Sequence, residues 1–114
     1  VEDCEAHKYA AHVSNVISSK LVAKHAAKND IRLIHISTDH FASEKTLSGE
    51  DEIGFPLNNY ALTKMHAEYE VLAQHPTAIV ARTNFFSWGL PHRRTFFDQI
   101  VESLRSNKDV TLFD

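Results

Sequence analysis

Hydrophobic positions along the chain follow two spacings that alternate from one end to the other. Apolar residues recur every three or four positions, a pattern that predicts amphipathic helices, over residues 10–28, 59–74 and 93–106. Between these segments lie short runs rich in β-branched residues, typical of strands buried in a parallel sheet, at residues 31–37, 77–83 and 109–113. The α-β-α-β-α-β order predicts part of a doubly wound α/β domain with helices on both faces of a parallel sheet.

Two loops leave the carboxyl ends of the first two predicted strands. Residues 38–57 are polar and contain Gly49, Gly54 and Pro56, whereas residues 84–92 are rich in aromatic side chains. Loops as long as the first are usually functional or disordered. Because ligands of parallel sheets bind outside the carboxyl ends of the strands, we expect a ligand site at this edge.

Tyr60 and Lys64 lie four residues apart at the start of the second predicted helix, and this spacing puts them on one helix face. A free phenol is a poor base at neutral pH because its unperturbed pKa is ~10, and a nearby ammonium lowers the pKa of a phenol. Such a pair can deliver or remove a proton at a carbonyl or alcohol. The same spacing also arises by chance on solvated helix faces, so its context decides the interpretation.

Ser37 and Thr38 supply hydroxyls at the end of the first predicted strand. A hydroxyl at this position could polarise the substrate oxygen that the tyrosine protonates. Successive strand residues point to opposite faces, so only one of the two can face that oxygen in a regular strand. We predict that Thr38 is the one.

Composition narrows the function classes further. The chain has 114 residues, the length of one domain or less, and its formal net charge of −3 gives no sign of a nucleic-acid or anionic-membrane partner. No apolar run is long enough to span a bilayer. A single cysteine, Cys4, fits a reducing cytoplasm. The eight histidines form no metal-binding motif, so we expect no metal, and we interpret His35 as a satisfied packing residue within a strand.

The ordered segments "HISTD", "EDE…PLNNYALTKMHAE" and "AIVART" resemble the extended short-chain dehydrogenase/reductases, and within them the dTDP-4-dehydrorhamnose reductase group. The resemblance covers nearly the whole chain. It implies a Rossmann-like fold, an NADPH or NADH cofactor and a nucleotide-sugar substrate reduced at a 4-keto group. After Ser-Thr-Asp the sequence departs from the family's usual spelling and reads "HFASEK", which leaves sugar specificity open.

The resemblance also implies catalytic roles. Tyr60 would donate the proton to the substrate C4 oxygen, and Lys64 would favour the phenolate and bind the nicotinamide ribose. Thr38 would hydrogen-bond the reacting oxygen, with Ser37 as the less favoured choice. Asn15 would match a helix asparagine that holds a water in a proton relay to the lysine.

Further residues are implied in binding. The resemblance places Ser37, Thr83 and Asn84 near the cofactor, at the carboxyl ends of the two strands. Asp39 would lie near the sugar. Phe85 and Phe86 could line the sugar or nicotinamide pocket, although such aromatics are more often core residues. A phosphate contact by Arg93 or Arg94 is a weaker hypothesis.

A dinucleotide needs a Gly-rich turn to seat its diphosphate on a helix N-terminus. The three glycines, at positions 49, 54 and 89, do not form one. We therefore interpret residues 1–114 as the central or second part of a Rossmann-like domain. We expect these residues alone to be inactive, and the whole protein to be a homo-oligomer.

Two other functions stay open. The same fold serves nucleotide-sugar epimerases and dehydratases, and dehydratases usually add an acid beside the hydroxyl, a position that Asp39 could fill. Non-catalytic, NADP-binding regulatory subunits also resemble the reductases.

Overall fold

The computed structural model describes residues 1–42, 49, 54–84, 87, 89, 90, 92 and 94–110. They belong to two compact units, Val1–Thr83 and Asn84–Asp114. In the described part of the chain, every helix is too short or too polar to cross a bilayer.

The N-terminal third of the chain is helical. It comprises α1 (Glu2–Ala6), α2 (Lys8–His12), a π-helical stretch η1 (Val13–Ile17) and α3 (Ser18–Lys28). The helix predicted over 10–28 is confirmed, but the sequence pattern did not reveal the π-helical stretch or the helical residues before position 10. α3 ends where Asn29 turns its side-chain amide back onto the His25 carbonyl at 2.7 Å, and Asp30 takes a positive φ of 52°.

The two strands β1 (Ile34–Ile36) and β4 (Ile79–Ala81) pair in parallel, as the sequence predicts, although both are shorter than expected. The register places Ile34 opposite Ile79 and Ile36 opposite Ala81. The third predicted strand is not formed at positions 109 and 110, and its remaining residues lie outside the described part of the chain.

The segment predicted as an unstructured loop holds a small antiparallel pair, so that prediction is wrong in part. β2 (Phe41–Ala42) pairs with β3 (Phe55–Pro56). Gly54 permits this approach, because a Cβ at Gly54 would lie 2.5 Å from the Phe41 Cβ. Residues 43–48 and 50–53 lie outside the described residues.

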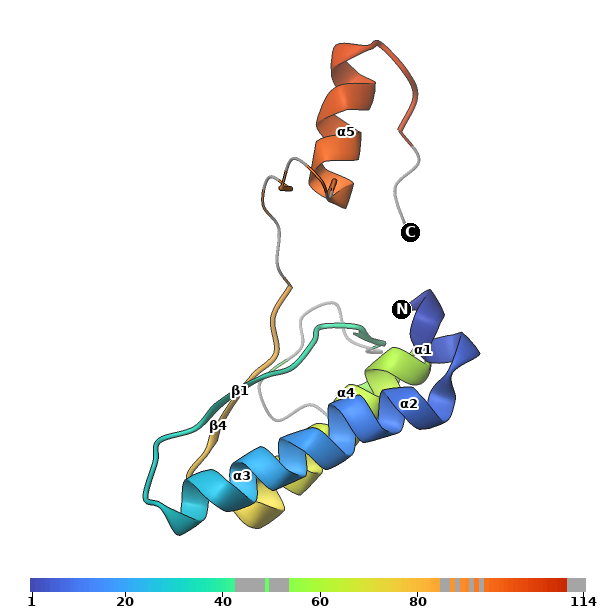
Figure 1. Ribbon diagram of the computed structural model, residues 1–114. Helices are drawn as coiled ribbons and strands as arrows, with labels where there is room; N and C mark the ends of the chain where they lie inside the picture. The colour runs from blue at the N-terminus through green and yellow to red at the C-terminus, as the bar shows by residue number, and fades with distance from the viewer. Residues whose placement is uncertain are drawn as a thin grey trace. The chain divides into compact units, whose positions relative to one another are not determined.

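The predicted helix over 59–74 is confirmed as α4 (Asn59–Gln74). It begins at Asn58, whose side chain accepts a hydrogen bond from the Ala61 N–H at 2.8 Å, and Pro76 follows its end. α4 packs along α3, as Figure 1 shows. Small buried residues allow this close approach: Ala23, Ala26, Ala61, Ala67 and Val71.

One face of the β1–β4 pair stays exposed. Ile34 is 56% exposed and its register partner Ile79 is 53% exposed. Among the described residues, β1 pairs with β4 alone. Exposed apolar strand surfaces of this kind are usually covered by another segment of chain.

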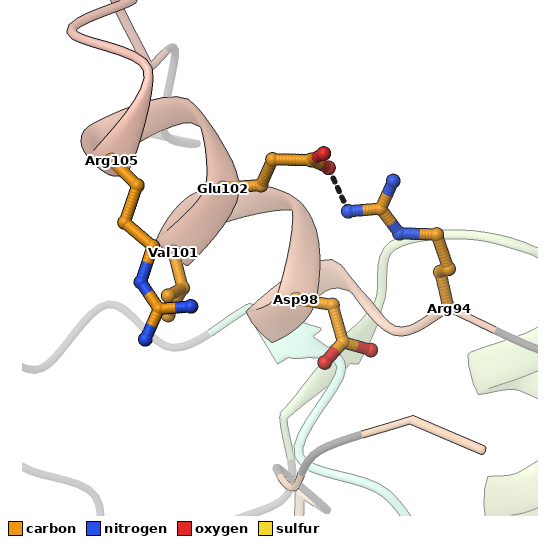
Figure 2. A pocket seen from close by; sticks show the side chains of 5 residues that line it. All are labelled: Arg94, Asp98, Val101, Glu102 and Arg105. Atoms are coloured by element: carbon orange, nitrogen blue, oxygen red, sulfur yellow. Dashed lines mark hydrogen bonds and ion pairs between the residues drawn. The ribbon is translucent and has the colours of Figure 1, made fainter. Parts of the chain in front are cut away.

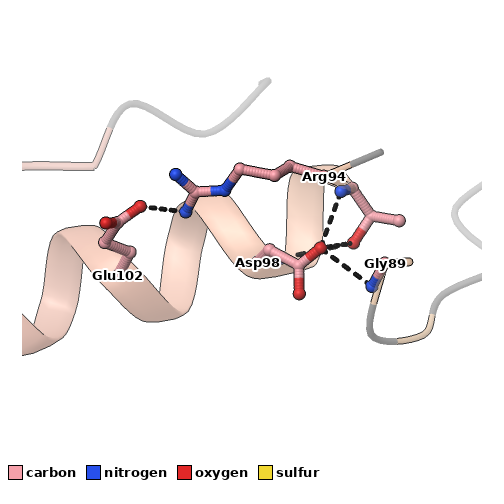
Figure 3. Close-up of polar contacts among 5 residues, drawn as sticks. Gly89, Arg94, Asp98 and Glu102 are labelled. Atoms are coloured by element: carbon pink, nitrogen blue, oxygen red, sulfur yellow. Dashed lines mark hydrogen bonds and ion pairs between the residues drawn. The ribbon is translucent and has the colours of Figure 1, made fainter. Parts of the chain in front are cut away.

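The second unit contains α5 (Phe96–Arg105), which starts three residues later than the sequence pattern predicts. A capping box fixes the start: the Asp98 N–H donates to Thr95 Oγ1 at 3.3 Å, and the Asp98 carboxylate accepts from the Thr95 N–H at 2.7 Å. The same carboxylate accepts from the Gly89 N–H at 2.8 Å, as Figure 3 shows. These hydrogen bonds lower the pKa of Asp98, the one from the Thr95 backbone most.

Expressed by itself, the 114-residue chain is expected to self-associate, because Ile34, Ile36 and Ile79 present an apolar surface beside a strand edge that no described residue pairs with. Sedimentation velocity over a concentration series measures this. Ile34→Glu combined with Ile36→Glu should shift the chain toward monomer, whereas the control Leu104→Glu, on exposed α5, should not. A monomer at every concentration would contradict the prediction.

Candidate active site

Tyr60 and Lys64 lie in the first two turns of α4, and the start of that helix is held on two sides. Asn58 caps it as described above. The Asn59 side-chain amide donates to the Cys4 carbonyl at 2.8 Å, and the Asn59 N–H donates to the Glu5 carboxylate. α1 therefore docks beside the turn that carries Tyr60.

Lys64 joins α4 to the carboxyl end of β1. Its Nζ donates a hydrogen bond to the Ile36 carbonyl at 2.7 Å. Burial lowers the pKa of the Lys64 ammonium, and the negative charge of Glu68 opposes part of that shift. The half-buried ammonium thus lies next to the strand end from which Ser37 and Thr38 emerge.

Ser37 and Thr38 are both buried, but their hydroxyls have different partners. Ser37 Oγ donates to the Glu68 carboxylate. Thr38 Oγ1 accepts from the His40 N–H at 3.3 Å, a bond that does not use the hydroxyl proton of Thr38. The Ser37 proton is therefore used by Glu68, whereas the contact with His40 leaves the Thr38 proton unused.

The ring of His40 touches the ring of Tyr60 edge-on. The ring centroids are 6.0 Å apart and the planes lie at 87°. This contact places the segment after Thr38 beside the phenol. No spacing pattern in the sequence predicts this contact between the rings, because His40 and Tyr60 lie on different elements.

Asn15 lies in η1, and its side-chain amide donates to Thr63 Oγ1 at 2.9 Å. Thr63 Oγ1 in turn donates to the Tyr60 carbonyl at 2.9 Å. π-helical turns are frequent at functional sites, and this one directs Asn15 at the turn between Tyr60 and Lys64. The water relay implied for Asn15 stays a prediction.

Glu68 is a site residue that sequence reasoning missed. It is buried one turn after Lys64 and accepts hydrogen bonds from Arg82, with Nη2 2.7 Å from Oε2. The hydrogen bonds that Arg82 donates to the Glu68 carboxylate raise the pKa of Arg82. The only sequence signal for Glu68 is its i,i+4 spacing from Lys64, which says nothing of strand-end partners.

The other residues predicted to bind cofactor or sugar lie at strand ends, in the second unit or outside the described residues. Asp39 is exposed directly after Thr38, and Thr83 follows β4 by two residues. Asn84 begins the second unit. Phe85 and Phe86 lie outside the described residues.

The interpretation of His35 as a satisfied packing residue is wrong for one atom. His35 Nε2 is buried and has no hydrogen-bond partner among the described residues. Burial lowers the pKa of His35, as does Lys64, while Glu68 raises it. Within the part of the chain that the structure describes, no three His, Cys, Asp or Glu side chains are grouped to hold a metal ion.

A separate hollow lies on α5, lined by Arg94, Asp98, Val101, Glu102 and Arg105. Figure 2 shows Arg94 turned toward the Glu102 carboxylate, with which it forms an ion pair. Asp98 is engaged in the helix cap. The phosphate contact considered for Arg94 stays a prediction, and Arg93 lies outside the described residues.

Comparison with known proteins identifies the family. The family model of the RmlD substrate binding domain matches residues 1–114. The chain belongs to this family. It is 38% identical over 87 residues to the dTDP-4-dehydrorhamnose reductase of Mycolicibacterium smegmatis, a match that covers 73% of this chain and 26% of the relative. The Mycobacterium tuberculosis enzyme of the same name is 32% identical over 90 residues, covering 73% and 29%.

Two solved structures confirm the Rossmann-like fold class. A dTDP-4-dehydrorhamnose reductase from Clostridium acetobutylicum aligns with a TM-score of 0.75 at 26% identity, covering 93% of this chain and 38% of that one. The enzyme from Bacillus anthracis, solved in complex with NADP, aligns with a TM-score of 0.74 at 26% identity, covering 96% and 39%. The chain thus spans well under half the length of the relatives that it matches.

Proposed function

We propose that the whole protein is an NAD(P)-dependent reductase of a 4-keto nucleotide sugar, of the dTDP-4-dehydrorhamnose reductase type. The observation that carries this proposal is the junction of α4 with β1, where Lys64 Nζ donates to the Ile36 carbonyl one turn from Tyr60. It brings a phenol, an ammonium and a hydroxyl-bearing strand end together. The family and the names of the relatives support the same reaction.

Each residue has a chemical task in this proposal. Tyr60 donates its hydroxyl proton to the C4 oxygen as the ketone becomes an alcohol. Thr38 hydrogen-bonds the same oxygen and stabilises the negative charge that develops there. Lys64 keeps a positive charge near the phenolate left on Tyr60. Asn15 anchors the turn that carries both side chains, through Thr63.

The residues present fit the nicotinamide end of a cofactor, NADPH or NADH. The half-buried Lys64 can donate to ribose hydroxyls at the carboxyl edge of the strands, where Ser37 and Thr83 also emerge. A bound nicotinamide supplies the hydride to C4. The Gly-rich turn that would seat the diphosphate is not part of these 114 residues. The relative from B. anthracis was solved with NADP, which supports this choice of cofactor.

A nucleotide-sugar epimerase or dehydratase is the second candidate. The exposed Asp39 beside Thr38 is the observation that favours it, since a carboxylate there could take part in proton transfer. A non-catalytic NADP-binding subunit would not require the combined set of Tyr60, Lys64 and Thr38.

We also propose a cytoplasmic location and homo-oligomeric assembly for the whole protein.

The reaction is tested by incubating the whole protein with NADPH and dTDP-4-dehydro-6-deoxysugar. The proposal expects stoichiometric loss of nicotinamide absorbance, and transfer of deuterium from labelled NADPH to C4 of the product. A parallel incubation with a dTDP-hexose that carries a 4-hydroxyl and with NAD⁺ tests the alternatives: epimerisation or loss of water without net cofactor reduction would instead assign an epimerase or dehydratase. Cofactor binding without either reaction would assign a binding subunit.

Tyr60→Phe in the whole protein should lower kcat by about 10²–10⁴-fold, because the phenol proton is lost while the ring remains. Affinity for NADPH should change little. The matched control is Tyr69→Phe, at a half-exposed position later in α4. Turnover near that of the unmodified protein in Tyr60→Phe would remove Tyr60 from the role of proton donor.

Thr38 and Ser37 should respond differently to loss of their hydroxyls. Thr38→Val should lower kcat by about 10²–10³-fold, the usual effect of removing one donor to a developing oxyanion, and Thr38→Ser should retain most activity. Ser37→Ala should lower kcat less than Thr38→Val does, and it should also lower the unfolding temperature, because Ser37 donates to the buried Glu68. Steady-state kinetics and thermal unfolding measure both, and a reversed order of kcat losses would transfer the role to Ser37.

A further inference from the structure

Glu68 is a buried carboxylate with hydrogen bonds to two different strand ends. It is only 6% exposed and lies on α4, one turn beyond Lys64. Its Oε1 accepts from Ser37 Oγ and, at 3.0 Å, from Arg82 Nε. Its Oε2 accepts from Arg82 Nη2 at 2.7 Å, so the guanidinium binds in a forked arrangement.

The two partners of Glu68 occupy equivalent positions in the sheet. Ile36 and Ala81 are the last paired residues of β1 and β4, and the Ser37 N–H donates to the Ala81 carbonyl at 2.8 Å. Ser37 and Arg82 are therefore the first residues beyond the paired strands. One carboxylate joins both strand ends to α4.

The contacts continue from Arg82 into the segment after Thr38. The Arg82 guanidinium lies over the Phe41 ring, 4.9 Å from its centroid. Phe41 pairs with Pro56 in the β2–β3 ribbon. Asp39 and His40 lie between Thr38 and Phe41, and His40 contacts Tyr60. Glu68 thus constrains the chain on both sides of Thr38.

We propose that Glu68 is a positioning residue, which clamps the carboxyl ends of β1 and β4 to α4 and thereby holds Thr38 and Lys64 in register with Tyr60. This inference rests on the proposed reductase function. Glu68 touches neither the sugar nor the cofactor in it. Its effect passes through Ser37, Arg82 and the charge of Lys64.

The charges around Glu68 make the role measurable. It faces Lys64 on α4, Arg82 after β4 and His35 of β1. Lys20 of α3 pairs with Glu70 instead, at 3.0 Å. Burial lowers the pKa of Lys64 and Glu68 opposes that shift. Removing the charge of Glu68 therefore lowers the pKa of Lys64 further, and the ammonium is lost at a lower pH.

The test uses Glu68→Gln and the matched control Glu70→Gln in the whole protein. Both remove one negative charge from α4, but Glu70 pairs with Lys20 rather than with the strand ends. Glu68→Gln should lower kcat by about 10²-fold, the effect expected of misplacing reacting groups by ~1 Å. The pH above which NADPH binding weakens should move down in Glu68→Gln and stay unchanged in Glu70→Gln.

A double-mutant cycle keeps the proposal testable if Glu68→Gln folds poorly. Ser37→Ala and Arg82→Lys are milder changes at the two clamped ends, and each should reproduce part of the loss in kcat. In thermal unfolding, the effects of Ser37→Ala and Arg82→Lys should not add, because both act through Glu68. Additive effects, or an unchanged kcat and pH limit in Glu68→Gln, would overturn the clamp.

The two proposals can fail separately. If the unmodified protein binds NADPH but does not reduce the sugar, the proposed function fails. Two measurements then still decide whether Glu68 acts as described. They are the pH above which NADPH binding weakens in Glu68→Gln, and the double-mutant cycle measured by thermal unfolding.

Discussion

The parallel pairing of β1 with β4 is the constraint on which the candidate site depends. It aligns the ends of the two strands, so that Ser37 and Arg82 leave the sheet at the same level. An antiparallel pair would put those residues at opposite ends. Because both strands deliver polar groups to one edge, a single helix crossing that edge can contact them all. α4 is that helix, and its polar face carries Tyr60, Lys64 and Glu68 at successive turns.

Lys64 and Glu68 on α4 are both partly or fully buried, so each needs partners that stabilise its charge. A half-buried ammonium is destabilised by loss of water, and the lowered pKa of Lys64 expresses this cost. Two features offset it: the Ile36 carbonyl accepts a hydrogen bond from Nζ, and Glu68 contributes a negative charge one turn away. Glu68 in turn is buried beside Arg82, since a buried carboxylate without a partner would be strongly unfavourable. The charge of Lys64 is thus stabilised by Glu68, and the charge of Glu68 is stabilised by Arg82.

Local signals in the sequence predicted the helices and strands but not the side-chain contacts between them. Asn58 and Pro76 bound α4, and the β-branched runs located β1 and β4, because capping and strand propensity act over a few residues. Residues 37, 68 and 82 have no periodic relation, so their meeting follows only from the folded topology. The later start of α5 arises from the capping box of Thr95 with Asp98, which overrides the hydrophobic pattern. The π-helical turn at Asn15 likewise has no simple sequence signature.

The hydrogen-bond partners of Ser37 and Thr38 separate two hydroxyls that the sequence alone does not distinguish. Both hydroxyls leave the same strand end and both are buried, so neither burial nor position separates them. Their partners do, because the Ser37 proton is directed at Glu68. Thr38 Oγ1 instead accepts from the backbone of His40, a residue whose ring touches Tyr60. A hydroxyl that accepts from a backbone N–H still has its own proton to donate. The Ser37 hydroxyl thus holds the end of β1 to Glu68, and this difference in partners is the reason for proposing Thr38, rather than Ser37, as the residue that hydrogen-bonds the substrate oxygen.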